Sequence, residues 1–236
     1  MISSNNRKKL AVLIDPDKTS KEQLQIVFEI YIRAKVDVFL VGSSLLLRNS
    51  VCEVVEFLKQ NTTIPVYLFP GNIMQVCSKA DGILLLSLIS GRNPELLIGQ
   101  QVLAAPSIKA ANFDVIPTGY MLIDSGKTTS VEYMSNTKPI PSDKPDIAVC
   151  TAMAGEQLGM KAVYLEAGSG AKKPVPAELI AAVRDSIEVE IWVGGGIKTP
   201  QAAIEACNAG ADVIVIGTAF EQSPELIEKI ATAIHQ

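Results

Sequence analysis

The sequence predicts an α/β fold, a closed (β/α)8 barrel that forms one domain over residues 1–236. Short, wholly apolar runs recur eight times along the chain, and a segment of helical periodicity follows nearly every one. Such runs are typical of parallel strands buried on both faces, and eight of them with crossovers favour a closed barrel over an open sheet. The length of 236 residues is close to the roughly 250 residues usual for this architecture.

Each predicted strand is an apolar run that stops at residues with turn-forming chemistry. The first run stops at Asp15 and Pro16, and the third stops at Pro70 and Gly71. Proline lacks a backbone N–H and glycine adopts conformations closed to other residues, so both interrupt strands. The eight strands are predicted at residues 10–14, 37–41, 65–69, 82–86, 115–117, 162–165, 190–193 and 213–216.

The segments between the strands carry apolar side chains at helical spacing. In the first segment Leu24, Val27 and Tyr31 share one face, and Ser20 stands where its side chain can cap the helix. Further helices are predicted at residues 47–60, 93–111, 147–158, 176–186, 199–209 and 224–234.

Two connections depart from this pattern. Residues 73–79 are too few for an ordinary crossover helix, so an irregular or missing helix is predicted after the third strand. Residues 124–146 are polar and too long for a tight turn, which favours an active-site lid or an excursion.

Composition excludes several classes of protein. A net charge of −4 argues against a nucleic-acid partner held by bulk charge. No apolar stretch approaches the ~18 residues of a membrane span, and the first apolar run is too short for a secretory signal. A soluble, cytoplasmic protein is therefore expected. Because 48% of the residues are hydrophobic, peripheral contact with a membrane stays open.

The four cysteines give no sign of a metal or disulfide framework. Cys52, Cys77, Cys150 and Cys207 are widely spaced, and no two of them form a C-x-x-C pair. This usage suits a reducing compartment, and the cysteines are expected to be ordinary core or surface residues.

Glycine loops after the last strands predict a phosphate site. Gly194, Gly195 and Gly196 follow the seventh strand, and Gly217 with Thr218 follows the eighth. Glycine lets backbone N–H groups approach an anion closely, and these two loops form the usual phosphate pocket of such barrels. The alternative is a tight strand-to-helix turn.

A third loop, after the sixth strand, has small residues that could complete the cradle. It contains Gly168, Ser169 and Gly170, and the Ser169 hydroxyl offers a further hydrogen-bond donor.

Charged residues at the strand ends predict the chemistry. Asp15 ends the first strand, Lys18 follows it, and the hydroxyl of Ser43 or Ser44 lies at the end of the second strand. One carboxylate and a hydroxyl suit Mg²⁺, which keeps positions for water and substrate phosphates. The alternative is that Asp15 caps the turn before Pro16.

Glu166 ends the sixth strand, two residues after Tyr164. A glutamate at this place can accept a hydrogen bond from a substrate hydroxyl and take its proton. The alternative is a structural salt bridge. His235, the only histidine, lies at the C-terminal end and is a poor candidate for a catalytic base.

Seven motifs occur in order over essentially the whole chain: LIDPDK, VGSS, YLFPGN, PTGY, YLEAGSGA, VGGGI and VIGT. With them the chain resembles the geranylgeranylglyceryl phosphate synthase family, also called phosphoglycerol geranylgeranyltransferases. The resemblance implies transfer of a C20 prenyl group from geranylgeranyl diphosphate to the C3 hydroxyl of sn-glycerol 1-phosphate. It also implies a requirement for Mg²⁺ and a homo-oligomer.

The resemblance further implies a role for each matching residue. Asp15 and Ser44 would hold the metal, Tyr164 and Glu166 the glycerol hydroxyls, and Glu166 would accept the proton. Gly168 would contact the substrate, and its phosphate would be bound by Ser169, Gly194, Gly195, Gly196, Gly217 and Thr218.

The chain departs from the family at two positions. Some members carry asparagine where this chain has Thr218. Some bacterial relatives carry lysine where this chain has Leu13, which makes Lys18 the candidate for binding the diphosphate.

Other functions stay open at this point. The donor could be longer, such as a C35 heptaprenyl diphosphate. The chain could instead be a phosphosugar-binding barrel enzyme of another reaction class, or a barrel without catalysis. On the prenyltransferase hypothesis, the irregular segment after the third strand leaves room for the prenyl chain, and the polar segment 124–146 covers the diphosphate.

Overall fold

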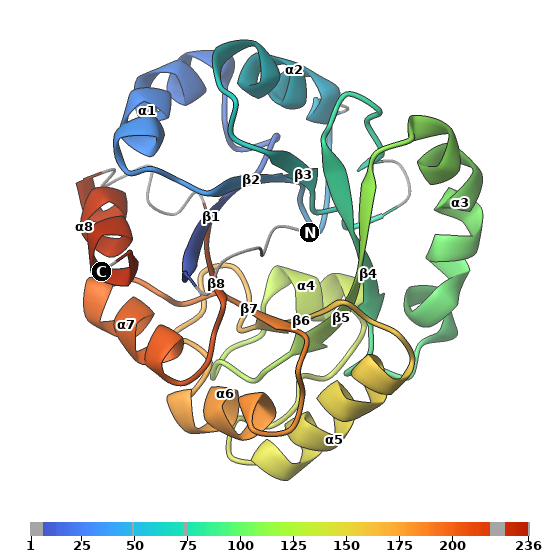
Figure 1. Cartoon of the computed structure of the whole chain (residues 1–236). Coiled ribbons are helices and arrows are strands. Elements are labelled where there is room, and N and C mark those ends of the chain that lie inside the picture. The colour runs from blue at the N-terminus through green and yellow to red at the C-terminus, as the bar shows by residue number, and fades with distance from the viewer. Residues whose placement is uncertain (1–6, 49, 73–74, 218–224, 236) are drawn as a thin grey trace.

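Eight parallel strands close into a barrel in the computed structural model, which describes residues 7–48, 50–72, 75–217 and 225–235. Each strand pairs with the next one along the chain, and β8 pairs with β1 to close the sheet (Figure 1). The strands are β1 (Lys9–Ile14), β2 (Val38–Val41), β3 (Val66–Leu68), β4 (Gly82–Leu88), β5 (Asp114–Leu122), β6 (Ala162–Glu166), β7 (Glu190–Gly194) and β8 (Val213–Gly217). The predicted (β/α)8 barrel is confirmed.

Helices surround the barrel. They are α1 (Lys21–Arg33), α2 (Val51–Asn61), η2 (Glu95–Gly99), α3 (Gln100–Ala111), α4 (Ser130–Ser135), α5 (Pro145–Gln157), α6 (Ala177–Arg184), α7 (Pro200–Asn208) and α8 (Glu225–Ile234). Ser20 caps α1 as predicted, because its side chain accepts a hydrogen bond from the Gln23 N–H in a capping box. The predicted helix 93–111 is divided into the π-helical turn η2 and α3.

Side-chain alternation along the strands separates two apolar cores. Alternate residues such as Leu40 and Trp192 fill the barrel, while Phe39 and Val193 lie among the residues that pack under the helices. In β6, Tyr164 belongs to the inner core and Leu165 to the outer one. Glu166, the next residue, therefore points into the mouth of the barrel.

The ring of helices is open between α2 and α3. Among the described residues that follow β3, 69–72 and 75–81, none lies in a helix of more than one turn, and only loops occupy this part of the ring in Figure 1. The prediction of an irregular or missing helix is confirmed. Here Gln75 is fully buried, and its side chain exchanges hydrogen bonds with the Ser43 backbone: its oxygen accepts from the N–H, and its amide donates to the carbonyl.

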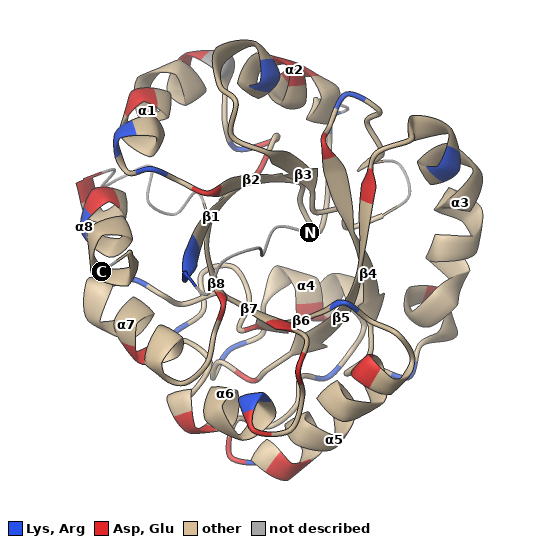
Figure 2. Ribbon diagram, viewed as in Figure 1, with Lys and Arg blue, Asp and Glu red and all other residues tan. Residues whose placement is uncertain are grey.

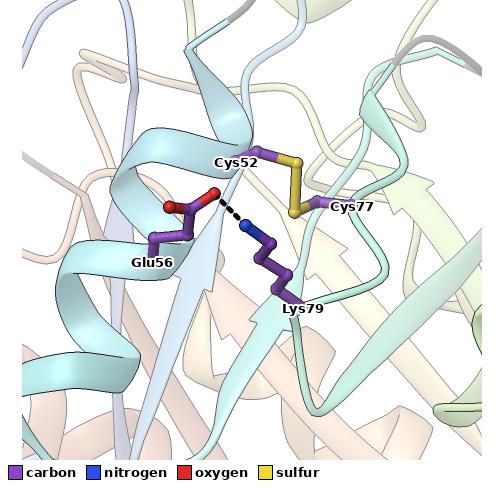
Figure 3. Close-up of a disulfide and its surroundings, with 4 residues drawn as sticks. All are labelled: Cys52, Glu56, Cys77 and Lys79. Carbon is purple, nitrogen blue, oxygen red and sulfur yellow. Dashed lines mark hydrogen bonds and ion pairs between the residues drawn. A yellow bond between two sulfur atoms is a disulfide. The ribbon is translucent and has the colours of Figure 1, made fainter.

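A disulfide joins this irregular segment to α2. Cys52 on α2 is bonded to Cys77, and beside the bond Lys79 forms an ion pair with Glu56 (Figure 3). The expectation that the cysteines stay unpaired is wrong for this pair, because the missing helix brings residue 77 against α2. Cys150 and Cys207 are free, as expected.

No helix among the described residues is long and apolar enough to cross a membrane. Figure 2 shows both signs of charge spread around the helical ring, without a continuous basic face in that view.

Candidate active site

A cavity of about 470 Å³ opens at the carboxyl ends of the strands, within the usual volume of ligand pockets. Most of the predicted site residues line it together: Asp15, Lys18, Ser44, Tyr164, Glu166, Gly168, Ser169, Gly195, Gly196 and Gly217. Gly194 lies directly behind Tyr164, because a β-carbon on Gly194 would lie 2.2 Å from the Tyr164 hydroxyl. Thr218 lies outside the described residues.

Glu166 is a buried acid of this cavity, with only 6% of its surface exposed. Its carboxylate accepts a hydrogen bond of 2.5 Å from the Gly168 N–H and further bonds from the hydroxyls of Tyr120 and Tyr164. Burial raises the pKa of Glu166 to about 7, although these three hydrogen bonds act to lower it. The alternative of a structural salt bridge finds no support, because no described Lys, Arg or His forms an ion pair with Glu166.

Tyr120 and Tyr164 hold the carboxylate from two sides. They occupy the same register on the neighbouring strands β5 and β6, and their ring centroids are 5.3 Å apart. Burial, and then the nearby Glu166 carboxylate, raise the pKa of both hydroxyls well above the usual value. Both tyrosines therefore remain protonated and donate to the Glu166 carboxylate.

Replacing Tyr120 by phenylalanine should move the acidic limb of the kcat/KM profile to higher pH. The lost hydrogen bond stabilises the charged form of Glu166, so its pKa should rise further, by up to about one unit. The acidic limb of kcat/KM reports ionisation of the free enzyme and of the free substrate. Because the substrate titrates identically with the wild type and with Tyr120→Phe, a difference between the two profiles belongs to the enzyme. The control is Tyr67→Phe, because the Tyr67 hydroxyl donates to Asp114 at the opposite end of the barrel. Coincident profiles for Tyr120→Phe and the wild type would refute the assignment.

Gly195 and Gly196 lie where a side chain would collide with the neighbouring loop. Gly195 has a φ of +82°, and a β-carbon there would lie 2.6 Å from both the Glu166 Oε1 and the Gly168 N. Gly196 has a φ of +73°, and its β-carbon would meet the Lys173 carbonyl oxygen at 2.7 Å. These contacts bring the β7 loop against the β6 loop. The two loops thus form one concave surface of backbone, as the phosphate prediction requires.

Oxygen atoms gather around Asp15 at the other side of the mouth. One carboxylate oxygen accepts from the Ser43 hydroxyl at 3.0 Å and pairs with the Lys18 ammonium at 2.7 Å. The other accepts from the Asp17 N–H at 3.1 Å. The structure thus joins Asp15 to Ser43 by a hydrogen bond. Ser44, the predicted metal ligand, lines the same cavity.

These oxygens can supply only some of the ligands of a magnesium ion. No cluster of three or more His, Cys, Asp or Glu side chains capable of holding a metal occurs among the described residues. Mg²⁺ commonly uses one or two carboxylates and takes its remaining ligands from water and substrate phosphates. The single carboxylate and two hydroxyls are therefore a suitable donor set for a metal that arrives with a phosphorylated substrate.

Several participants were not predicted from the sequence. Asp17 is structural, since its carboxylate accepts hydrogen bonds from the backbone N–H groups of Leu47 and Arg48. Ser43, and not Ser44, donates to Asp15, a choice that the sequence pattern does not make. Tyr120 is buried in the inner core, and its alternation with Thr118 along one strand is the signal in the sequence that it points inward.

An apolar arm of the cavity runs towards the open part of the ring. Its lining comes from β4, η2, α3 and the irregular segment, and consists of Val76, Ile83, Leu85, Leu86, Leu88, Leu96, Ala104 and Ile108. A missing crossover helix normally exposes the outer face of a barrel to water. Here the outer-face residues Ile83 and Leu85 are apolar and line the same cavity as Glu166, while Leu86 and Leu88 line it from the inner side of β4.

The excursion between β5 and α5 covers the mouth. Val131 and Met134 on α4 line the cavity, and Thr129 lies over Gly168, where a β-carbon would meet the threonine Cγ2 at 2.3 Å. The interpretation of residues 124–146 as an excursion over the site is supported, and Thr129 of this excursion contacts the β6 loop.

A family model and the most similar curated proteins point to the same family. The model of the PcrB family matches residues 4–235. A protein of Spirosoma linguale called geranylgeranylglyceryl phosphate synthase is 50% identical and aligns with 98% of this chain and 93% of its own length. A protein of the same name from Chitinophaga pinensis is 52% identical, over 97% and 90% of the two chains.

Solved structures give the same picture. The (S)-3-O-geranylgeranylglyceryl phosphate synthase of Thermoplasma acidophilum, in complex with its substrate sn-glycerol-1-phosphate, superposes with a TM-score of 0.92 at 33% identity, covering 98% of this chain and 94% of that one. A thiamine phosphate pyrophosphorylase of Pyrococcus furiosus has a TM-score of 0.60 at 14% identity over 97% and 96%, and shares only the fold.

Proposed function

The chain belongs to the PcrB family, and on this basis we propose that it is a prenyltransferase of ether-lipid synthesis. It moves a geranylgeranyl group from geranylgeranyl diphosphate to the C3 hydroxyl of sn-glycerol 1-phosphate and releases diphosphate. Two relatives of about 50% identity carry the name of this activity, and the similar Thermoplasma structure contains this acceptor.

One observation of the structure carries the proposal. Glu166, a carboxylate with a pKa of about 7, stands where a cradle of glycine backbone meets an apolar arm. A phosphorylated alcohol fits the cradle and a prenyl chain fits the arm, so the hydroxyl and the allylic carbon meet beside a base.

The proposed reaction uses these residues in one displacement. The bond between the allylic carbon and the diphosphate oxygen breaks, and the C3 hydroxyl oxygen forms the ether bond. The hydroxyl proton passes to Glu166, which is ionised in most molecules only above about pH 7. Tyr120 and Tyr164 keep the carboxylate oriented by donating to it.

Mg²⁺ is proposed as the cofactor, with Asp15 and Ser44 as its protein ligands. When bound, the ion would neutralise charge on the departing diphosphate. Lys18, which pairs with Asp15, is proposed to bind the same diphosphate in place of the lysine that some relatives have at the Leu13 position. Ser43 is a second candidate hydroxyl because it already contacts Asp15.

Replacing Asp15 by asparagine should weaken the dependence on magnesium. The loss of one carboxylate should raise the Mg²⁺ concentration for half-maximal activity by about tenfold or more, and raise the KM for the prenyl diphosphate. A magnesium titration of initial rates measures both. Asp17→Asn serves as the control, since that carboxylate holds loop backbone instead. An unchanged magnesium requirement in Asp15→Asn would exclude the residue as a ligand.

A transfer assay tests the whole proposal. Purified protein receives labelled sn-glycerol 1-phosphate, Mg²⁺ and, in separate reactions, C10, C15, C20 or C35 diphosphate. Label that moves into an organic solvent, with C20 as the best donor, would establish the activity. No transfer with any donor would exclude it. A longer C35 donor is not favoured, because the relatives are named for the geranylgeranyl product.

The remaining partners stay predictions. A homo-oligomer would cover exposed apolar side chains such as Ile98, Val102 and Leu103 near the open part of the ring, and light scattering would measure its mass. Peripheral membrane contact would use Leu47, 82% exposed at the mouth. The cytoplasmic location also stays a prediction. The Cys52–Cys77 disulfide means that the cysteines no longer favour a reducing compartment.

A further inference from the structure

Lys127 lies on the excursion and has no role in the site described so far. It follows a tight turn in which the Gly126 N–H donates to the Asp124 Oδ1 at 2.8 Å. Gly126 has a φ of +80°, a conformation that glycine adopts without strain. This turn leads the chain back towards the barrel, so that Lys127 and Thr129 both lie beside the β6 loop.

The Lys127 ammonium stands over the predicted phosphate cradle. A β-carbon on Gly170 would lie 3.2 Å from the Lys127 Nζ, and Gly170 itself lines the main cavity together with Ser169. Lys127 also lines a small cavity under the excursion, of which Glu166 forms another wall. The lysine is therefore next to the glycine loop that follows β6.

This ammonium has no protein counter-ion in the part of the chain that the structure describes. Two other lysines of the mouth are already engaged: Lys18 pairs with Asp15, and the Lys198 ammonium donates to the Ala171 carbonyl oxygen at 3.1 Å. Lys127 is thus a cation at the cradle that remains available for an anion from solution. A phosphate oxygen is a strong acceptor for such a donor.

We propose that Lys127 binds the phosphate group of the acceptor and closes the cradle from the side of the excursion. The inference rests on the proposed function, since it takes the anion in the cradle to be sn-glycerol 1-phosphate. The excursion is then part of the acceptor site, and the charge that the glycine backbone lacks comes from this lysine.

The test is Lys127→Met, which removes the charge and keeps the apolar stem. The dissociation constant for sn-glycerol 1-phosphate, measured by calorimetry, should rise about tenfold. This factor is at the low end of the range for loss of a charge-assisted hydrogen bond, because the Lys127 side chain is exposed. KM for the acceptor should rise equally, and kcat at saturation should stay within about threefold. Raising the ionic strength should weaken acceptor binding less in this variant than in the wild type. Lys127→Arg should restore most of the affinity.

Lys138→Met is the matched control, an exposed lysine on the same excursion. Its acceptor affinity should equal that of the wild type. Wild-type affinity in Lys127→Met, or an equal loss in both variants, would overturn the inference while the transferase assignment stands. If the wild-type protein binds no sn-glycerol 1-phosphate and transfers no prenyl group, the proposed function fails, and the inference fails with it.

Discussion

Replacing Glu166 by glutamine is expected to lower kcat by roughly 10²–10⁴, the usual contribution of one general base. Glutamine keeps the shape of the side chain and can still accept the Gly168 N–H, but it cannot take a proton from the acceptor hydroxyl. Binding of both substrates should therefore remain largely intact. Single-turnover rates and equilibrium binding measured on the same preparation separate the two effects. Turnover near the wild-type value would remove Glu166 from the role of base.

The same substitution should stabilise the fold above neutral pH, which excludes unfolding as the cause of the lost activity. The folded pKa of about 7 lies above the ordinary value of 4.5, so the folded state binds more protons than the unfolded state between these values. Wild-type stability therefore falls as the pH rises through this window. Glutamine has no charge to bury. The Tm of the Glu166→Gln variant should therefore exceed that of the wild type at pH 8 but not at pH 4. Glu190→Gln, at the opposite end of the barrel, should retain turnover.

Replacing Gly195 by alanine is expected to lower kcat/KM for the acceptor by about 100-fold. The added β-carbon would lie 2.6 Å from the Glu166 Oε1 and from the Gly168 N, in a backbone conformation with φ of +82°. That conformation alone costs an alanine about 1–2 kcal/mol, and the β6 and β7 loops must move apart. A displacement of ~1 Å in a catalytic site can reduce the rate 10²-fold.

Gly217→Ala provides the comparison for this result. Gly217 has no positive φ, and its β-carbon would meet no protein atom within 4 Å, so Tm should not change. A rise in acceptor KM without a change in Tm would then report ligand contact at the end of β8. Wild-type kcat/KM in Gly195→Ala would show that the two glycine loops do not seat the acceptor.

The sequence predicted the strands well because buried parallel strands are continuous apolar runs. The fifth strand was the exception: it was expected over residues 115–117 and extends over Asp114–Leu122. Thr118 and Gly119 look like a turn in sequence. In the structure a β-carbon on Gly119 would lie 2.7 Å from the Ile89 Cδ1. The glycine is therefore required by close packing within a strand, and it does not mark a turn.

Features that depend on distant contacts were not predictable. Nothing in the spacing of Cys52 and Cys77 indicates a bond, because their approach requires the missing crossover helix. The choice of Ser43 over Ser44 as the partner of Asp15 depends on how the buried Gln75 holds the Ser43 backbone. Lys127 belongs to a polar stretch whose course over the barrel no local pattern specifies.

The pairing of β1 with β8 has a consequence for how the chain folds. Lys9 lies in register with Val213, so the sheet closes only when segments about 200 residues apart meet. Contacts of such sequence separation form slowly, since the entropy of closing the loop is lost before the contact is gained. During synthesis β1 leaves the ribosome about 200 residues before its partner β8. Until β8 is made, β1 presents a free strand edge, and the nascent chain is vulnerable to aggregation during that interval.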